Sequence, residues 1–390
     1  MSWSSLENAF TLIRNGASIK QDDNKLGIPI TRIETISNRS LDKGKLGYAN
    51  VLKNQYTDFY LKNGDILMSH INSLSHLGKT ALVESLEEEI IHGMNLLLLR
   101  ANTKILHPNY ANYYFSSPQF IKDLMKISNQ SVNQCSFSIS KLKDLQIPLP
   151  PLPVQKRIAE ILDAADALKR KDQELLKKYD ELAQAIFIDM FGDPVKNEKG
   201  WEVRTIGSLT SVGSGSTPSR QVNEYFGGPI SWVKTTEVNG QIIYSTEENI
   251  SEKGLKNSSC KLYPKNSVII AMYGQGKTRG QVGILGVEAT TNQACAVIKP
   301  SKELDSTFLF NYLKLSYKTL RELGRGGNQE NLNKGMIEDF EIIFPDYTKQ
   351  LEFNKRMEIL DSLKKSFNQN KSQNLFNSLI KKAFKGKLAL

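Results

Sequence analysis

The sequence has few of the residues that hold a disulfide framework or a metal ion. Three cysteines and four histidines are scattered along 390 residues, and no CxxC or HxxxH spacing occurs. The sequence therefore predicts neither paired disulfides nor a structural zinc site. Cys135, Cys260 and Cys295 are expected to stay reduced, as in a cytoplasmic protein.

Long hydrophobic runs are also missing. No stretch of about 18 apolar residues is available to cross a membrane. The first ten residues, MSWSSLENAF, lack the basic and then apolar order of a secretory signal. Apolar residues still make up 39% of the chain, and its length suits two domains with connectors. We expect a soluble protein of the cytoplasm.

Catalytic motifs are absent or incomplete. The segment AMYGQGKT at 271–278 resembles a phosphate-binding loop with alanine in place of the first glycine. Two glycines follow at 280 and 283 and disfavour the helix that such a loop must open. The adenine methyltransferase motif NPP(Y/F) is absent, and no acidic cluster has metal-ligand spacing. We expect no enzyme activity and no cofactor, and a nucleotide-binding P-loop enzyme remains an alternative.

The charge balance favours a polyanionic partner. The formal net charge is +10, from 51 lysines and arginines against 41 acids. Residues 361–390 hold seven lysines and one acid, Asp361. Such a balance favours nucleic acid through contacts with phosphate, although many soluble proteins are mildly basic.

The chain is a two-fold repeat with an offset near 200 residues. Short segments match in the same order in both halves, and the last match aligns Gln155 with Gln350. The clearest pairs are 28–33 with 228–233, 61–69 with 263–271, 78–83 with 280–285, and 142–158 with 337–353.

Each half combines a mixed unit with a long helix. The mixed units contain short β-rich runs between Gly, Asn and Ser turns, and one aromatic helical stretch each, at 109–115 and 307–315, which we interpret as core. The predicted class is α/β (α+β). The predicted domains are 1–147 and 193–345, connected by helical segments 148–192 and 346–390.

The first long helix carries a heptad seam. It begins after a proline-rich segment and ends at Gly192, Asp193 and Pro194. Spacings of four and three residues alternate through Val154, Ile158, Ile161, Ala165, Leu168, Asp172, Leu175, Tyr179, Leu182 and Ile186. The C-terminal helix has a similar seam at Phe353, Met357, Leu360 and Phe367.

Two seams in one chain predict that the helices pair with each other in antiparallel fashion. In that register Asp172 would lie beside residues 364–371, where Lys364, Lys365, Lys371 and Asn370 are available as partners. The alternative is that each helix docks on its own domain. A coiled-coil interaction protein without a DNA role also remains open.

Three segments resemble the specificity subunits of type I restriction-modification enzymes. IPLPPLPVQKRIAEILDAADAL at 147–168 is similar to their central region, and 191–219 is similar to the junction that opens their second recognition domain. The strings MYGQGKTRGQVGIL and TTNQACAVI within 272–298 are similar to a strand signature of that domain. The resemblance covers nearly the whole chain, and the first domain departs most from it.

The resemblance implies a non-catalytic, sequence-specific reader of duplex DNA. Each recognition domain would read half of a bipartite target in the major groove, and the helix pair would act as a spacer. The chain would recruit two modification subunits, which bind S-adenosylmethionine and methylate adenine. Restriction subunits, with ATP and Mg²⁺, would complete the enzyme.

Polar side chains in glycine-rich and turn segments are the candidate DNA contacts. Arg and Gln suit base edges, whereas Lys suits phosphates. The alternative is that these are ordinary solvated turns. The candidates in the second domain are Ser214, Ser216, Thr217, Arg220, Tyr273, Gln275, Lys277, Arg279, Gln281, Arg325, Asn328 and Gln329. Those in the first are His70, Asn72, Ser73, His76, Lys79, Asn133 and Gln134.

Overall fold

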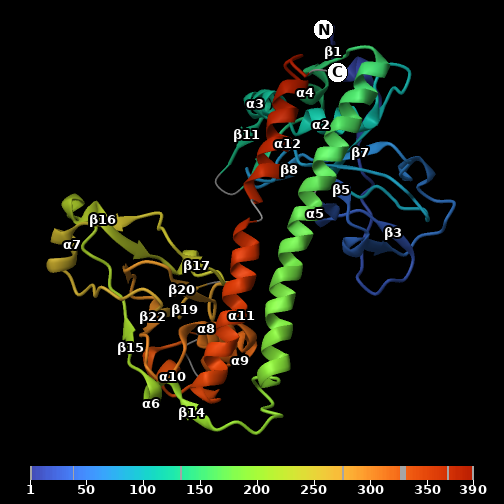
Figure 1. The fold of residues 1–390 in the computed structure, drawn as a ribbon. Coiled ribbons are helices and arrows are strands. Elements are labelled where there is room, and N and C mark those ends of the chain that lie inside the picture. Colours follow the sequence, from blue (N-terminus) through green and yellow to red (C-terminus); the bar gives the residue numbers. More distant parts are fainter. Residues whose placement is uncertain are drawn as a thin grey trace. The chain divides into compact units, whose positions relative to one another are not determined.

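The computed structural model describes residues 2–37, 39–131, 134–274, 276–325, 331–366 and 369–388. The chain divides into two compact units, residues 1–173 with 369–390 and residues 174–368. The ribbon is shown in Figure 1. No helix in these described ranges is both long and apolar enough to span a membrane.

The first unit is organised around a six-stranded sheet in the order β2-β10-β7-β9-β5-β4. Its pairs are antiparallel except for β5 with β9. Every residue of β7 is buried, because core clusters cover both faces of the sheet. The strands are β2 (Phe10–Asn15), β4 (Ile36–Ser37), β5 (Ser40–Leu41), β7 (Asp65–Ser69), β9 (Thr80–Leu82) and β10 (Leu96–Ala101).

Short strands and helices complete the first unit. Serine side chains cap three of the helices at their N-termini: Ser5 accepts from the N–H of Asn8, Ser117 from that of Phe120 and Ser138 from that of Lys141. The short strands are β1 (Trp3–Ser5), β3 (Ile28–Ile30), β6 (Gly47–Ala49), β8 (Ile71–Asn72), β11 (Asn129–Gln130), β12 (Cys135–Ser136) and β13 (Gln146–Pro148). The helices are α1 (Leu6–Ala9), α2 (Pro108–Phe115), α3 (Pro118–Ile127) and α4 (Ile139–Asp144).

The second unit repeats this arrangement. Its main sheet has the order β15-β22-β19-β20-β17, so β15, β22, β19 and β20 correspond to β2, β10, β7 and β9. The matched segments 61–69 and 263–271 hold β7 and β19, which confirms the predicted repeat. The strands are β15 (Val212–Ser214), β17 (Ile242–Ile243), β19 (Val268–Ala271), β20 (Val282–Leu285) and β22 (Cys295–Ile298).

A smaller sheet and several helices surround that core. The sheet β18-β16-β21 and the pair β14-β23 are formed by β14 (Val203–Thr205), β16 (Phe226–Val233), β18 (Asn249–Ile250), β21 (Ala289–Thr291) and β23 (Glu341–Ile343). The helices are α6 (Ile206–Leu209), α7 (Glu252–Lys256), α8 (Ser306–Leu315), α9 (Tyr317–Glu322) and α10 (Lys334–Glu338). The aromatic stretches predicted as core are α2 and α8, and most of their side chains are buried.

Three long helices follow the mixed segments: α5 (Leu152–Phe191), α11 (Tyr347–Ser366) and α12 (Gln369–Ala383). In the first unit, the N-terminal part of α5 shares a core cluster with α12. In the second unit, the C-terminal part of α5 packs on α11 in antiparallel order. The ring centroids of Phe187 and Phe353 lie 5.4 Å apart, and Asp180 pairs with Lys364 at 2.7 Å. Figure 1 shows α5 in green beside the red C-terminal helices.

Gln155 connects the start of α5 to the first unit. Its side chain is fully buried. The amide nitrogen donates to the carbonyl oxygens of Ile105 and Pro150, at 2.8 Å each. The amide oxygen accepts from the N–H of His107, also at 2.8 Å. Three backbone groups around the helix start are therefore satisfied by one side chain.

Gln350 has the same role at the start of α11, and it too is fully buried. Its amide nitrogen donates to Pro345 O at 2.8 Å and to Glu303 O at 3.4 Å. Its oxygen accepts from the N–H of Asp305 at 2.8 Å. The glutamines that the sequence repeat aligned thus make equivalent hydrogen bonds.

Several of the predicted pairing residues lie in the two core clusters. Ile158 is buried in the first cluster, and Phe353, Met357 and Leu360 are buried in the second. Ile161 and Leu175 are half-buried. Phe367 lies outside the described residues.

Two positions of the seam predicted on α5, Leu168 and Leu182, are wrong by one residue. Leu168 and Leu182 are 45% and 46% exposed, whereas Leu162 is fully buried and Ala183 packs on the second core. One residue corresponds to about 100° of helix rotation, so the predicted leucines point away from the core. The next residue, Lys169, is half-buried and takes the core-facing position that was predicted for Leu168.

The partner expected for Asp172 is also wrong. Lys364 pairs with Asp180, and no ion pair within the described ranges involves Asp172, which is half-buried. The buried acid of α5 is Asp166, at 3% exposure. The sequence pattern gave no reason to single it out, because Asp166 lies beside the predicted seam rather than on it.

Candidate nucleic-acid interface

The first unit contains a cavity of about 850 Å³ that brings together four of the predicted contacts. Asn72, Ser73, His76 and Lys79 all line it. They lie in and beside the loop between β8 and β9. The lining also carries five lysine and arginine side chains against two acidic ones, so the cavity has a positive balance.

Local hydrogen bonds hold the loop in shape. Asn72 Nδ2 donates to the Ser69 hydroxyl at 3.2 Å. The hydroxyls of Ser73 and Ser75 each lie 3.0 Å from Nδ1 of His76. The His76 ring is therefore positioned by its own loop while its side chain stays exposed.

A glycine closes this loop where another residue would not fit. Gly78 has φ +73°, and a Cβ there would lie 2.2 Å from Cδ2 of Leu124. The next residue, Lys79, is exposed and lines the cavity. The backbone thus packs closely on α3 just before it presents the lysine.

The basic wall of the cavity was missed by sequence reasoning. A 3-10 helix at Lys43–Lys45 begins with Asp42, whose carboxylate accepts from the N–H of Gly44 at 3.1 Å. Arg32 is held by Gln21 at 2.8 Å and by Asp23 at 2.5 Å. The lysines of the KGK segment were a usable signal, but their nearness to residues 72–79 arises only from the fold.

Two of the predicted contacts, His70 and Arg279, are buried in the structure. His70 is 7% exposed and lies edge-on to Phe137, with ring centroids 6.3 Å apart. Burial lowers the pKa of His70, which favours the neutral ring. Arg279 is 8% exposed. Both lie in β-strand connections whose polar composition resembles that of exposed turns.

In the second unit, the loop after β19 is held by α9. Tyr317 donates to the carbonyl oxygen of Lys277 at 2.8 Å, and Arg321 donates to that of Gly276 at 2.7 Å. The Lys277 and Tyr273 side chains are exposed, and Gln281 is half-buried. Two side chains of α9 thus hold carbonyl oxygens of this loop. Neither Tyr317 nor Arg321 was predicted.

The other polar segment of the second unit is built around Arg220. Its guanidinium lies 4.5 Å from the ring centre of Phe226 and 5.0 Å from that of Trp232, and it pairs with Glu248 at 2.8 Å. Thr217 donates to Gln293 at 2.5 Å. Cation–π contacts with both rings position Arg220, while half of its side chain stays exposed.

The remaining predicted contacts fall into two groups. Ser214 and Gln134 are exposed, and Ser216 is half-buried. The residues outside the description are Asn133, Gln275, Asn328, Gln329 and the side chain of Arg325. Across the described ranges, no group of three His, Cys, Asp or Glu side chains is placed to hold a metal ion.

The segment AMYGQGKT does not form a phosphate-binding loop. It joins β19 to β20, so a strand rather than a helix follows it. None of the described residues of this connection forms the helix N-terminus that would hold a nucleotide phosphate. The structure therefore removes the physical basis of the P-loop alternative.

Comparison with known proteins identifies the family. Residues 4–178 and 198–376 each match the model of the type I restriction modification DNA specificity domain. The chain belongs to this family. Two matched segments in one chain agree with the internal repeat and with the repeated strand order, and they support the specificity-subunit interpretation over the P-loop and coiled-coil alternatives.

Two specificity subunits illustrate the similarity, one over most of this chain and the other over about half of it. The putative type I restriction enzyme MjaX specificity subunit of Methanocaldococcus jannaschii is 33% identical over 379 residues, covering 92% of this chain and 86% of that protein. The EcoKI specificity subunit of Escherichia coli K12 is 25% identical over 190 residues, covering 47% of this chain and 41% of that protein.

A solved structure shares the fold. The crystal structure of the S subunit of the type I restriction-modification system from M. genitalium aligns with a TM-score of 0.58 at 14% identity. The alignment covers 98% of this chain and 96% of that one. The fold class predicted from the repeat is thereby confirmed.

Proposed function

We propose that this specificity subunit reads a bipartite sequence in duplex DNA, one half with each unit, and has no catalytic activity of its own. The observation that carries the proposal is the repeated strand order with different polar side chains at equivalent loops. Gly78-Lys79 in the first unit corresponds to Gly280-Gln281 in the second. A shared framework with divergent loops suits two heads that read different sequences.

Under this proposal, residues 1–147 and 193–345 are the recognition domains, and 148–192 and 346–390 form the connecting helices. Helix α5 has 40 residues and so a length of about 60 Å. Helix length would contribute to the spacing between half-sites. The exposed Lys79 and Lys277 side chains suit phosphates, whereas His76 and Arg220 suit base edges.

Variants in the two units should affect different halves of the target. We expect His76→Ala to relax recognition in one half-site and Arg220→Ala in the other, by about 1–3 kcal/mol if each contacts a base. The measurement is methylome sequencing of a host that carries each variant with its modification subunit.

Lysine variants separate affinity from specificity. Lys79→Gln and Lys277→Gln should weaken binding to all sequences and reduce the salt slope by about one unit each. Lys104→Gln, an exposed lysine away from the cavity lining, is the matched control. For the alanine variants, relaxed recognition of the same half-site by both His76→Ala and Arg220→Ala would contradict the proposal that each unit reads a different half-site.

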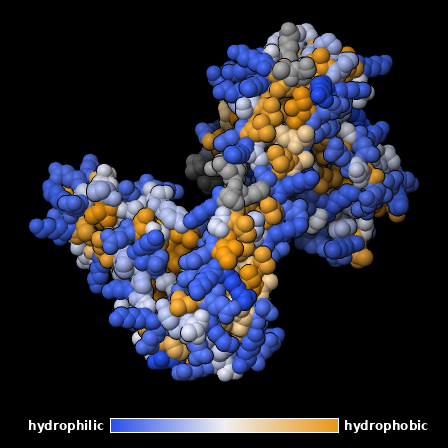
Figure 2. Space-filling model, in the orientation of Figure 1, coloured by the Kyte–Doolittle hydropathy of each residue, from blue (hydrophilic) through white to orange (hydrophobic). Residues whose placement is uncertain are grey.

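The catalytic subunits are proposed to dock on the long helices. Leu168 and Leu363, each 13 residues after the aligned glutamine, are about equally exposed at 45% and 46%. Figure 2 shows apolar side chains along α12 and also along α11. Exposed leucines at equivalent places suit two copies of one partner, the adenine-methylating modification subunit that binds S-adenosylmethionine. Restriction subunits with ATP and Mg²⁺ would join this core.

Replacing either leucine by a charged residue should prevent one of the two modification subunits from binding. We expect Leu168→Glu and Leu363→Glu each to change the complex from two modification subunits to one, because burying a carboxylate in an apolar contact costs at least about 2 kcal/mol. Native mass spectrometry of the reconstituted complex measures this. Lys177→Glu, an exposed change on the same helix, should keep both copies. Retention of both copies by both leucine variants would place the docking surface elsewhere.

A further inference from the structure

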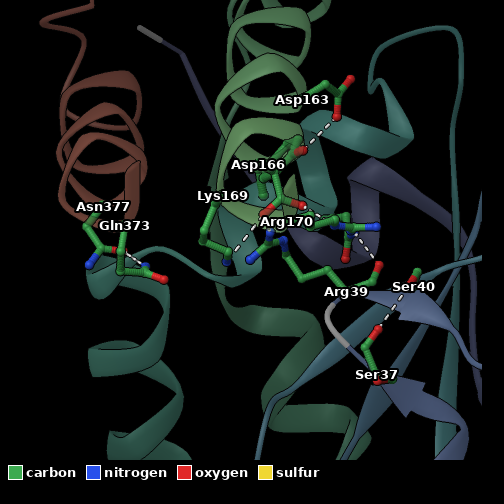
Figure 3. Close-up of polar contacts among 11 residues, drawn as sticks. Ser37, Arg39, Ser40, Asp163, Asp166, Lys169, Arg170, Gln373 and Asn377 are labelled. Atoms are coloured by element: carbon green, nitrogen blue, oxygen red, sulfur yellow. Dashed lines mark hydrogen bonds and ion pairs between the residues drawn. The ribbon is translucent and has the colours of Figure 1, made fainter. Parts of the chain in front are cut away.

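One acid of helix α5 is buried among three cations in the first unit. The Asp166 carboxylate pairs with Arg39, with Lys169 at 3.3 Å and with Nε of Arg170 at 2.9 Å. Figure 3 shows these side chains converging from α5 and from the turn that holds Arg39. Burial alone would raise the pKa of Asp166, but the hydrogen bond and charge of Arg39, with the two helix cations, hold it below its ordinary value.

Arg39 reaches this acid from a strained turn. It lies between β4 and β5 with φ +64°, a left-handed conformation that is uncommon for residues other than glycine. Its carbonyl oxygen accepts from the N–H of Leu82 at 2.9 Å and from Nδ2 of Asn112 at 3.2 Å. Strain of this kind persists only where the surroundings specify it, as they do here from two elements.

The same guanidinium also contacts the C-terminal helix. Its central carbon lies 4.5 Å from the ring centre of Phe376 on α12 and 5.5 Å from that of Tyr113 on α2. Nζ of Lys169 lies 4.7 Å from the Phe376 ring. Arg39 therefore ties the sheet to α5 by charge and to α12 by a cation–π contact.

The residues that hold Arg39 lie next to the cavity lining on both sides. Strand β5 ends two residues after Arg39, and the 3-10 helix Lys43–Lys45 of the basic wall follows. On the other side, Leu82 ends β9, which begins directly after Lys79. A movement of the Arg39 turn would shift both walls of the cavity against α5.

No equivalent ion pair is found at the matching acid among the described residues of the second unit. Asp361 lies 11 residues after Gln350, as Asp166 does after Gln155. In the part of the chain that the structure describes, Asp361 makes no salt bridge, and burial raises its pKa despite three nearby lysines. Among the described residues, the equivalent acid of the second unit thus has no such cluster of ion pairs, and Asp361 provides a matched control.

We propose that Arg39 is a positioning residue: through Asp166 and Phe376 it fixes the DNA-reading cavity of the first unit on the α5–α12 helix pair, and so restricts the spacing between half-sites that the subunit accepts. This inference rests on the proposed function. Arg39 itself reads no base, so its loss should leave the half-site sequence unchanged. Its loss should broaden the range of accepted spacers.

The test uses the full chain reconstituted with its modification subunit. Duplexes carry the native bipartite site or the same half-sites with the spacer changed by one base pair. We expect Arg39→Gln to raise methylation of the altered spacers relative to the native one by about tenfold, the effect of losing one hydrogen bond to a charged group. Arg39→Lys, which keeps the charge, should restore much of the restriction. Asp361→Asn should leave the ratio unchanged.

Arg39→Gln is preferred to Asp166→Asn because it leaves the acid paired with Lys169 and Arg170, so the fold is retained. Amide exchange of the purified chain gives a readout without DNA. Arg39→Gln should speed exchange at residues 40–45 and at Leu82, but not in β2 or β10. An unchanged exchange pattern, or an equal loss of methylation at every spacer, would overturn the inference. Absence of bipartite methylation by the wild-type complex would instead contradict the proposed function, and the exchange readout would still test the role of Arg39.

Discussion

Gln155→Leu is expected to lower the free energy of unfolding of the first unit by about 3–9 kcal/mol, and Gln350→Leu should do the same for the second unit. Leucine fills a similar volume but leaves buried backbone groups unpaired. In the first unit these are the carbonyls of Ile105 and Pro150 and the N–H of His107. Each unsatisfied buried group costs about 1–3 kcal/mol. Chemical denaturation, followed by probes placed in each unit, measures the loss.

Two comparisons make this result interpretable. Gln119→Leu removes an exposed glutamine whose hydrogen bond goes to Asp123 on the same helix, and it should change the free energy of unfolding by less than about 0.5 kcal/mol. A loss below about 1 kcal/mol for both buried glutamines would contradict the role assigned to them. A large loss in one unit alone would show that the repeat is not symmetric in energy.

Acidification is expected to destabilise the first unit through His92 by about 3 kcal/mol between pH 6.5 and pH 4. His92 is fully buried, and its Nε2 lies 2.9 Å from the carbonyl oxygen of Leu96. Burial, followed by weaker effects of Arg14 and His70, lowers the pKa of His92 to about 4. Below the ordinary value of 6.5 the unfolded chain binds a proton that the folded ring does not, so stability falls as the pH falls.

The measurement is the difference between wild type and His92→Gln in free energy of unfolding at pH 7 and pH 4. The glutamine amide can still donate toward Leu96 but does not titrate. The wild type should lose about 3 kcal/mol more than the variant across this range. Equal pH dependence of wild type and His92→Gln would show that His92 does not carry the effect.

The sequence alone determined the repeat, the aligned glutamines and the aromatic helices of the core. These features depend on local order: a strand pattern, a helix start after prolines, and a match between halves of one chain. The sequence repeat aligned Gln155 with Gln350, and the structure shows that both side chains form hydrogen bonds with equivalent backbone groups. The four candidate contacts between residues 72 and 79 line one cavity, because they lie close together in the chain.

Only the tertiary structure decided which apolar stripe of α5 is buried and what surrounds its acid. Leucines such as Leu168 and Leu182 fit a heptad as well as the buried positions do, and the choice between stripes rests on which neighbours cover them. The Arg39–Asp166 pair joins residues 127 positions apart, and Phe376 comes from the far end of the chain. The periodicity of a sequence shows which side chains share a face of a helix, but it does not show which face is buried. A buried charge also requires partners, and only long-range folding brings them together.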